Sequence, residues 1–216
     1  MNNFILFLLR IYRPAETVQQ SSTKGGNMLN FQRIDSVSNP HFLNLFNLYT
    51  QSFPSSERRS WAGLEMELMS ENSFNAHVLL QNDKFVGFLN YWTFERFLYI
   101  EHFAVSSNLR GKNIGTEAMK ILMEQTKLPI LFEVEMPNNI MAVRRIGFYE
   151  RLGFSVLSHN YAQPPYEGNG FIVPMLIMCN NTHFANTHFE MIKNTLYDEV
   201  YHYEREEPLT AIGELY

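Results

Sequence analysis

The chain of 216 residues contains a single cysteine, Cys179, which excludes an intrachain disulfide bond. It has no Cys-x-x-Cys pair, and its seven histidines are scattered without the spacing of a metal-binding motif. We therefore expect a protein without a metal cofactor. Because disulfides are rare in reducing compartments, the cysteine content favours a cytoplasmic location.

Basic charge is also scarce. The formal net charge is −5, whereas surfaces that bind nucleic acid usually carry a basic excess. We therefore expect no nucleic-acid partner. A local basic pocket for an anionic cofactor remains compatible with this charge.

The N-terminal region has no long apolar run. The run from Phe4 to Leu9 is too short to span a membrane, and no Lys or Arg precedes it as in a signal peptide. We expect no membrane partner, and we interpret residues 1–27 as a flexible extension ahead of Met28. A peripheral helix docked on the domain is the alternative.

Apolar and aromatic residues are plentiful instead. Hydrophobic residues make up 45% of the chain, and its length suits one sizeable domain. We expect a single domain over residues 28–216 that ends in a helix over about residues 183–206. The pattern leaves open whether this helix covers the sheet or forms a homodimer interface.

Hydrophobic periodicity predicts an α/β protein with a mixed (α+β) sheet. Three β-rich runs in succession predict an antiparallel meander, and a strand–helix–strand unit follows it. The usual right-handed crossover would make residues 97–105 and 130–135 parallel neighbours. The predicted elements, in chain order, are a strand at 28–37, helices at 40–53 and after Pro54, strands at 74–81, 84–93 and 97–105, a helix from Ile114, a strand at 130–135, a helix at 140–152, and strands at 154–160 and 171–178.

Turn and cap residues mark some of the boundaries. Asn39-Pro40 predicts the start of the first helix, and Asn82-Asp83 predicts a tight turn between two strands. Pro174 lies inside the last predicted strand. Because proline lacks a backbone N–H, this position favours an edge strand.

The stretch LRGKNIGTEAMK, residues 109–120, follows a predicted buried strand and opens a helix. Backbone N–H groups at a helix N-terminus have no internal partner and point at one spot, which suits an anion such as a diphosphate. Arg110 and Lys112 add positive charge. The stretch is neither a GxxxxGK(S/T) P-loop nor a GxGxxG turn. An ordinary helix with a basic entrance explains this stretch alone equally well.

A second stretch, RRIGFYERLGF, covers residues 144–154. It places Tyr149 one turn before the end of a predicted helix, with Gly153 as the C-terminal cap. Taken alone, a core position is the commoner role for a helical tyrosine.

Together, the two stretches resemble the GNAT superfamily of acetyl-CoA-dependent N-acetyltransferases, and the element order matches over roughly residues 28–178. FAVSSNLRGKNIGTEAM is similar to the Q/R-x-x-G-x-G/A pyrophosphate motif, with Arg110 in the Q/R place and Gly115 as the second glycine. Asn113 replaces the first glycine. Asparagine tolerates positive φ, and its side chain could also cap the helix that follows. FYERLGF is similar to the family's later motif.

The resemblance implies a GNAT acyl-CoA N-acyltransferase fold, in which an antiparallel meander runs into a parallel strand pair with flanking helices. It implies that acetyl-CoA lies where the strands 97–105 and 130–135 splay apart, with its diphosphate on the amides of the loop. A backbone N–H near Ala104 would polarise the thioester carbonyl. The cofactor-binding residues implied in this way are Phe103, Ala104, Val105, Arg110, Gly111, Lys112, Asn113, Ile114, Gly115 and Thr116.

The resemblance also implies two catalytic groups. Glu133 falls at the strand position of the glutamate base in the family's ribosomal-protein acetyltransferases, and Tyr149 at the position of its tyrosine general acid. Strand alternation places Glu135 on the same side as Glu133. Glu101 and His102 are competitors for the base, and alternation predicts that they face opposite sides of their strand.

The acceptor side matches the family less well. The family pattern N-x-x-A-x-x-x-Y is not reproduced, because Asn139 and Ala142 precede Tyr149 by three residues too many. We therefore expect a longer connection there and assign Asn139 no cofactor role. The acceptor pocket is predicted to form from residues 52–61 and 160–170, lined by Arg58, Trp61, Tyr161 and Tyr166. An ion pair with Arg144 or Arg145 is an alternative role for the strand acids.

These features predict an enzyme, an acyltransferase that moves an acetyl group from acetyl-CoA to a primary amine of a small molecule or peptide. The amine would attack directly in a ternary complex. One alternative is a GNAT-fold module that binds acyl-CoA without turnover, as a sensor or partner domain. Another is a regulatory protein with a vestigial anion site. Tyr149 and the Arg110/Gly115 frame favour the enzyme.

Overall fold

The computed structural model describes residues 28–70, 73–166 and 171–203. The predicted extension at 1–27 and the end of the predicted C-terminal helix, at 204–206, lie outside these ranges. None of the helices within the described ranges has the length and apolar character of a membrane span.

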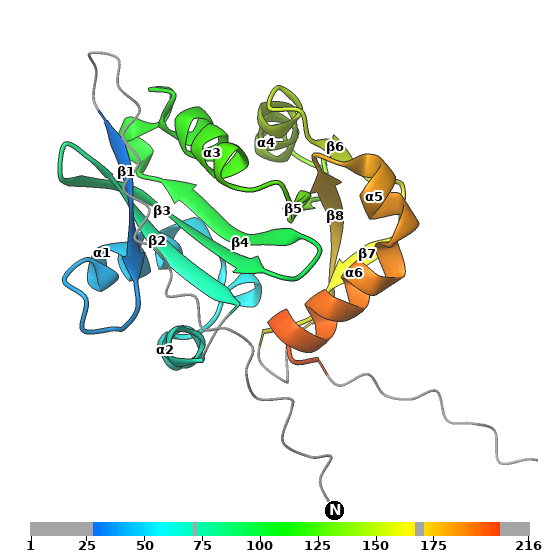
Figure 1. Cartoon of the computed structure of the whole chain (residues 1–216), viewed down its shortest axis with the longest axis horizontal. Coiled ribbons are helices and arrows are strands. Elements are labelled where there is room, and N and C mark those ends of the chain that lie inside the picture. Colours follow the sequence, from blue (N-terminus) through cyan, green and yellow to red (C-terminus); the bar gives the residue numbers. More distant parts are fainter. Residues whose placement is uncertain (1–27, 71–72, 167–170, 204–216) are drawn as a thin grey trace, which may run out of the picture.

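The strands form one mixed sheet (Figure 1). Its order is β1-β2-β3-β4-β5-β8-β6, and β7 also pairs with β8. Among the described strands only β4 and β5 are parallel, so the predicted meander and parallel pair are confirmed. The strands are β1 (Leu29–Ile34), β2 (Phe74–Gln81), β3 (Lys84–Thr93), β4 (Leu98–Val105), β5 (Ile130–Glu135), β6 (Ser155–Val156), β7 (Tyr161–Gln163) and β8 (Val173–Cys179).

Helices cover both faces of the sheet, and each face has its own apolar core. One core lies between the sheet and α1, α2 and α6, and the other lies between the sheet and α3 and α4 (Figure 1). We call these the α1/α2 face and the α3/α4 face. The helices are α1 (Phe42–Ser52), α2 (Trp61–Met69), α3 (Ile114–Gln125), α4 (Ile140–Glu150), α5 (Thr182–Thr187) and α6 (Phe189–Thr195), with 3-10 turns at Ser55–Glu57 and Ser107–Leu109 and a π-helical turn at Leu196–Val200.

The predicted boundaries agree with most elements, although the strand predicted at 28–37 ends at Ile34 and the strand predicted at 154–160 is reduced to β6. The first helix begins at Phe42 rather than Pro40, because the side chain of Asn39 accepts a hydrogen bond from the His41 N–H and closes a turn first. The predicted loop at 160–170 contains β7. The predicted edge position of Pro174 was wrong, since β8 lies between β5 and β6/β7. Its pairing with β5 begins one residue later, so the missing N–H falls outside that ladder.

The turn between β2 and β3 follows its prediction. Asn82 and Asp83 have φ of 50° and 61°, the left-handed pair that a two-residue hairpin turn requires. Asparagine and aspartate adopt this conformation more readily than most residues.

β4 carries a bulge that its sequence does not reveal. Asn90 of β3 pairs with His102, whereas the next residue, Tyr91, pairs with Ile100. Glu101 is therefore an extra residue in β4.

The bulge changes the direction of two polar side chains. Glu101 contacts Arg59, and the ring of His102 contacts the backbone of Glu57, so both point to the α1/α2 face. The prediction that Glu101 and His102 face opposite sides was wrong. Side chains alternate between the two faces only along an uninterrupted strand, and the extra residue of a bulge breaks this alternation.

β4 and β5 pair only at their beginnings. Their parallel register runs from Leu98–Ile130 to Ile100–Phe132 and stops there. Beyond this point the two strands diverge (Figure 1). β5 stays in the sheet through its antiparallel pairing with β8, which continues to Glu135. The structure thus contains the predicted parallel pair, and its strands splay apart as the family resemblance implies.

Candidate active site

The loop before α3 adopts an unusual backbone conformation. Gly111 and Asn113 have φ of 79° and 63°. Glycine and asparagine are the residues that take up such angles at least cost, which explains why Asn113 can replace a glycine. Asn113 is the N-cap residue of α3, but its side chain makes no capping hydrogen bond. A residue whose side chain caps a helix normally has an extended backbone. Asn113 has a left-handed backbone instead, so the expected side-chain cap is absent.

The N-terminus of α3 presents backbone donors to its surroundings. The first intrahelical bond runs from the Glu117 N–H to the Asn113 carbonyl, at 2.9 Å. The N–H groups of Ile114, Gly115 and Thr116 precede it and have no acceptor within the helix. Arg110 and Lys112 are exposed beside them. Donors and positive charge together can hold an anion at this end of α3.

The backbone of β4 beyond its pairing with β5 presents further donors and acceptors. Ser106 N–H donates to the Val86 carbonyl of β3 at 2.9 Å, and backbone direction alternates along a strand. Ala104 therefore points its N–H toward β3. Phe103 and Val105 point theirs toward the side where β5 has diverged. Phe103 and Val105, and not Ala104, are therefore the residues whose backbone groups could form hydrogen bonds with a ligand beside β4.

Glu133 of β5 points to the α1/α2 face, where tyrosine hydroxyls surround its carboxylate. Tyr161 donates to Oε1 at 2.5 Å, and Tyr201 donates to Oε2 at 2.8 Å. Burial raises the pKa of Glu133 to about 7, although these hydrogen bonds favour the charged form and lower it. A carboxyl with this pKa can take up and release a proton near neutral pH.

The other acidic candidates are held in ion pairs. Glu135 pairs with Arg145 of α4, which matches the alternative role considered from the sequence. Glu101, with only 1% of its side chain exposed, accepts from Arg59 Nε at 3.1 Å and from Trp92 Nε1 at 2.7 Å. Both carboxylates thus have cationic or N–H partners of their own.

His102 is also engaged. Its Nε2 lies 2.9 Å from the Glu57 carbonyl oxygen, and because a carbonyl only accepts, Nε2 carries the proton. Its Nδ1 then holds the lone pair, 3.8 Å from a Glu101 oxygen. Burial lowers the pKa of His102 from its usual value, so the ring is neutral at pH 7.

Tyr149 of α4 lies on the α3/α4 face of the sheet. Its ring packs on Phe132, with centroids 4.2 Å apart, and Phe132 is the last β5 residue paired with β4. Tyr149 is only 9% exposed. Burial raises the pKa of Tyr149 to about 12, so the hydroxyl is protonated at neutral pH.

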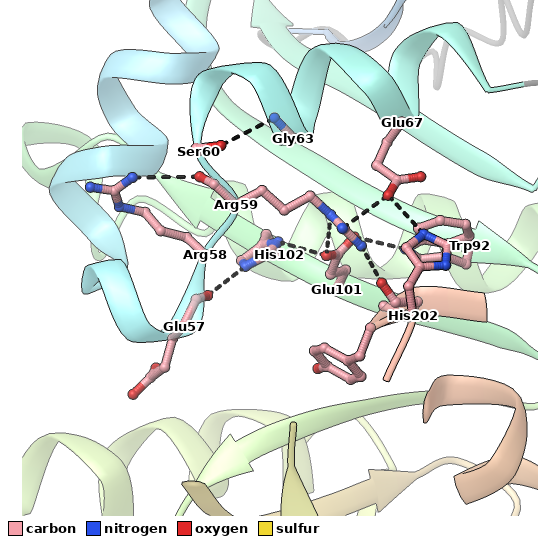
Figure 2. A network of polar contacts seen from close by, with 12 residues as sticks. Glu57, Arg58, Arg59, Ser60, Gly63, Glu67, Trp92, Glu101, His102 and His202 are labelled. Atoms are coloured by element: carbon pink, nitrogen blue, oxygen red, sulfur yellow. Dashed lines mark hydrogen bonds and ion pairs between the residues drawn. The ribbon is translucent and has the colours of Figure 1, made fainter. Parts of the chain in front are cut away.

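Arg59 forms a buried network that the sequence did not indicate (Figure 2). Its Nη1 lies 2.9 Å from Glu67 of α2, its Nε lies 3.1 Å from Glu101 of β4, and its Nη2 donates to the Val200 carbonyl at 2.5 Å. Although burial opposes it, the two carboxylates raise the pKa of Arg59 above its usual value. One guanidinium therefore joins α2, the β4 bulge and the C-terminal turn.

The sequence analysis predicted Arg58, the neighbouring arginine, as a residue of the acceptor pocket. Arg58 donates to the Phe53 carbonyl at 3.1 Å, within its own loop. The two arginines are adjacent in a segment without periodicity, so no sequence signal tells which one points inward. Trp61 packs edge-on against Phe42 of α1, with ring centroids 4.7 Å apart, and is not among the hydrogen-bond partners of Glu133.

The two predicted tyrosines do reach the region of Glu133. Tyr161 bonds to Glu133 directly. The ring of Tyr166 lies 5.0 Å from the Arg59 guanidinium and 5.0 Å from the Tyr201 ring. Residues of the predicted segments thus meet over the α1/α2 face, although Trp61 and Arg58 are not among them.

Asn139 has a structural role. Its side chain caps α4 by accepting from the N–H groups of Met141 and Ala142, each at 2.9 Å. The three additional residues before Tyr149 lie inside α4, which runs without interruption from Ile140 to Glu150. The expected longer connection was therefore wrong, and the extra length is about one helical turn.

The C-terminal segment contributes more than the single helix predicted for it. It forms α5, α6 and the π-helical turn, which bury Phe189, Ile192, Leu196 and Val200 in the core of the α1/α2 face. Tyr201 follows the turn and reaches Glu133. The helical pattern of the segment did not indicate this hydrogen bond.

The mixed sheet, its single parallel pair and the flanking helices define an acyltransferase fold of the GNAT type. A family model described as acetyltransferase (GNAT) family matches residues 42–154. A structure from Bacteroides thetaiotaomicron that is assigned to the GNAT acetyltransferases is 35% identical to the chain. That match covers 81% of this chain and 99% of the other, with a TM-score of 0.76. The chain belongs to the GNAT acetyltransferase family, as its sequence predicts.

More distant structures share the fold. Arabidopsis thaliana Naa50, solved with the bisubstrate analogue CoA-Ac-MVNAL, is 17% identical, with 71% of this chain and 98% of that chain covered and a TM-score of 0.52. The ribosomal-protein-S18-alanine N-acetyltransferase from Escherichia coli is 18% identical, with 70% and 92% covered and a TM-score of 0.51. None of the curated proteins matches the chain in sequence.

Proposed function

We propose that the protein is an N-acetyltransferase that moves an acetyl group from acetyl-CoA to a primary amine of a small molecule or peptide. The observation that carries the proposal is the end of the β4–β5 pairing at Ile100 and Phe132. Beyond this point, the backbone of Phe103 and Val105 has no strand paired with it on the side away from β3 among the described residues. This free backbone is close in sequence to the donors at the start of α3.

Two parts of acetyl-CoA, its pantetheine arm and its diphosphate, could bind to these backbone groups. Its pantetheine arm contains amide groups that can pair with Phe103 and Val105 as an added strand would. Its diphosphate can accept from the N–H groups over residues 110–116, and Arg110 and Lys112 supply positive charge. The Naa50 structure holds an analogue that contains CoA, which is consistent with this use of the fold.

In the proposed reaction, the acceptor first loses a proton, because an alkylammonium has no lone pair with which to attack. Glu133 takes that proton. The amine nitrogen then bonds to the thioester carbon, and a backbone N–H of Phe103 or Val105 stabilises the oxyanion. When the tetrahedral intermediate collapses, the C–S bond breaks, and Tyr149 gives its proton to the leaving thiolate. The nitrogen, which still carries one proton more than an amide, loses it to solvent, and proton exchange with solvent restores the Tyr149 hydroxyl and the Glu133 carboxylate. The products are the acetylated amine and CoA.

The choice of Glu133 as the base rests on its contacts. Glu135 and Glu101 face cationic partners, whereas the carboxylate of Glu133 contacts only tyrosine hydroxyls among the described residues. A carboxylate has more acceptor sites than the two that Tyr161 and Tyr201 use. An ammonium proton can therefore still reach it, directly or through one water molecule.

Two measurements test the proposal. Isothermal titration with acetyl-CoA should show saturable binding, and a thiol-release assay over a panel of small amines and peptides should show turnover. Binding without thiol release from any acceptor would favour the alternative, a GNAT-fold module that binds acyl-CoA without turnover. If acetyl-CoA does not bind at high micromolar concentration, both assignments fail.

A further inference from the structure

Tyr201 belongs to a relay of hydroxyl groups that ends on Glu133. Its hydroxyl donates to Glu133 Oε2 at 2.8 Å and lies 3.0 Å from the Tyr99 hydroxyl. Because a hydroxyl has one proton, Tyr201 can donate to Glu133 only if Tyr99 donates to Tyr201. Tyr161 donates to the other carboxylate oxygen at 2.5 Å. Each oxygen of Glu133 thus has its own donor, from a different part of the chain.

The turn that carries Tyr201 is fixed at two points. The Val200 carbonyl accepts from Arg59, which is itself held by two buried carboxylates (Figure 2). On its other side, the Tyr197 hydroxyl donates to the Ala162 carbonyl of β7 at 2.6 Å. Tyr201 is 4% exposed, and its N–H donates to the Leu196 carbonyl at 3.0 Å. Its hydroxyl therefore occupies one place relative to Glu133.

We propose that Tyr201 is a positioning residue, which holds the carboxylate of Glu133 in the orientation needed to take the acceptor's proton. The C-terminal turn is then part of the reaction site, in addition to covering the sheet. This inference rests on the proposed function, since it assumes that Glu133 acts as the base.

The groups that face Glu133 determine how it responds to pH. They are the hydroxyls of Tyr99, Tyr161 and Tyr201, which favour the carboxylate, and the more distant charge of Glu101, which disfavours it. Burial is the largest influence and also disfavours the carboxylate. Removing the Tyr201 hydroxyl therefore raises the pKa of Glu133 further above its usual value.

The variant Tyr201→Phe tests this role, with Tyr197→Phe as the matched control. Tyr197 belongs to the same turn, but its hydroxyl bonds to a backbone carbonyl of β7. In Tyr201→Phe, the acidic limb of the kcat/KM profile should move upward by about 0.5 to 1 pH unit, the effect of losing one hydrogen bond to a charged acceptor. The plateau at high pH should fall about three- to tenfold, because the base is less well oriented. The KM for acetyl-CoA should not change.

Tyr197→Phe should leave the acidic limb in place, even if it loosens the turn. Tyr99→Phe removes the donor behind Tyr201 and should move the limb in the same direction by a smaller amount. The inference is wrong if Tyr201→Phe, with an unchanged melting temperature, keeps the wild-type limb and plateau. It is also wrong if Tyr197→Phe shifts the limb equally, since a general loosening of the turn would then explain both.

A second readout separates this inference from the proposed function. Infrared difference spectra can follow protonation of the Glu133 carboxyl in the absence of substrates, with Glu133→Gln as the reference that lacks the band. The titration midpoint should rise in Tyr201→Phe whether or not acetyl transfer occurs. If the midpoint rises while Glu133→Gln retains full acetyl transfer, the hydrogen bond is real, but the assignment of Glu133 as the base fails.

Discussion

Glu133 and Tyr149 lie on opposite faces of β5, near the point where that strand separates from β4. Glu133 bonds to Tyr161 and Tyr201 on the α1/α2 face, whereas the Tyr149 ring packs on Phe132 on the α3/α4 face. In the proposed reaction, one of these groups removes a proton from the amine and the other protonates the thiolate. In that reaction, their placement on opposite faces would keep the two proton transfers apart.

Replacement of Tyr149 by phenylalanine should slow the reaction without weakening cofactor binding. Loss of a general acid typically lowers the rate by about 10²-fold or more. The drop should appear in kcat, measured by thiol release, while titration with acetyl-CoA gives an unchanged affinity. Tyr91→Phe is the control, because Tyr91 packs on the same face but stacks on His77. Equal rates for the wild type and Tyr149→Phe would remove the acid role.

Glu133→Gln should abolish the acidic limb of the pH–rate profile. The wild-type enzyme needs the carboxylate, so its kcat/KM should fall as pH decreases through about 7. Glutamine cannot take a proton, and the residual activity of the variant should show no limb there. Glu135→Gln, which removes the partner of Arg145, should keep it. A limb that persists in Glu133→Gln and disappears in Glu135→Gln would reverse the assignment.

The same pKa predicts how stability changes with pH. The Glu133 carboxyl binds its proton more tightly in the folded state, with a pKa of about 7, than in the unfolded chain, where its pKa is near the usual value of 4.5. Its contribution to stability is therefore fully present below about pH 4.5 and lost as pH rises toward 7. Urea unfolding of the wild type and Glu133→Gln should show the wild type losing stability relative to the variant across this range. A difference independent of pH would contradict the raised pKa.

The sequence predicted the parts of the site that depend on local pattern. The strand–loop–helix unit around Asn113 and the Tyr149 helix were predicted because periodicity and cap residues mark them. The parallel pair of β4 and β5 followed from the handedness of the crossover.

The sequence did not predict features that depend on three-dimensional register. The bulge at Glu101 leaves no mark on the apolar pattern, yet it turns Glu101 and His102 to one face. Arg59 bonds to Val200, the residue before Tyr201, across 141 positions of sequence, and no local pattern indicates this contact. These contacts depend on how the helices and strands pack against one another, which local sequence patterns do not indicate.

Lys112→Ala should weaken acetyl-CoA binding and leave the proton-transfer steps unchanged. Lys112 is exposed beside the start of α3, so its charge is partly screened, and its loss should raise Kd about three- to tenfold. The effect should shrink at high salt, and the pH–rate profile at saturating acetyl-CoA should match the wild type. Lys120→Ala, which removes an exposed lysine further along α3, is the control and should bind normally. A changed pH profile in Lys112→Ala would contradict this division of roles.

Substitutions of Asn113 should report on its left-handed backbone. Asn113→Ala should cost about 1 kcal/mol of stability, because alanine has no means of favouring positive φ. Asn113→Gly should be neutral or slightly stabilising, and it should not weaken acetyl-CoA binding. Asn108→Ala is the control, because Asn108 lies in the preceding 3-10 turn and does not have a positive φ. Thermal unfolding and titration with acetyl-CoA measure both effects, and equal stability of the alanine and glycine variants would show that the strain is unimportant.

Arg59→Met should be among the most destabilising single substitutions in this region, because it removes the arginine that pairs with the buried carboxylates of both Glu67 and Glu101. Removing one partner of a buried ion pair typically costs about 3–5 kcal/mol, which urea unfolding can measure. Arg58→Met, which removes only contacts to backbone carbonyls, should cost about 1 kcal/mol. The triple variant Arg59→Met/Glu67→Gln/Glu101→Gln should recover part of the loss, since it removes the uncompensated charges but not the lost packing. If the triple variant is no more stable than Arg59→Met, then Arg59 stabilises the fold mainly by filling space between α2, the β4 bulge and the C-terminal turn.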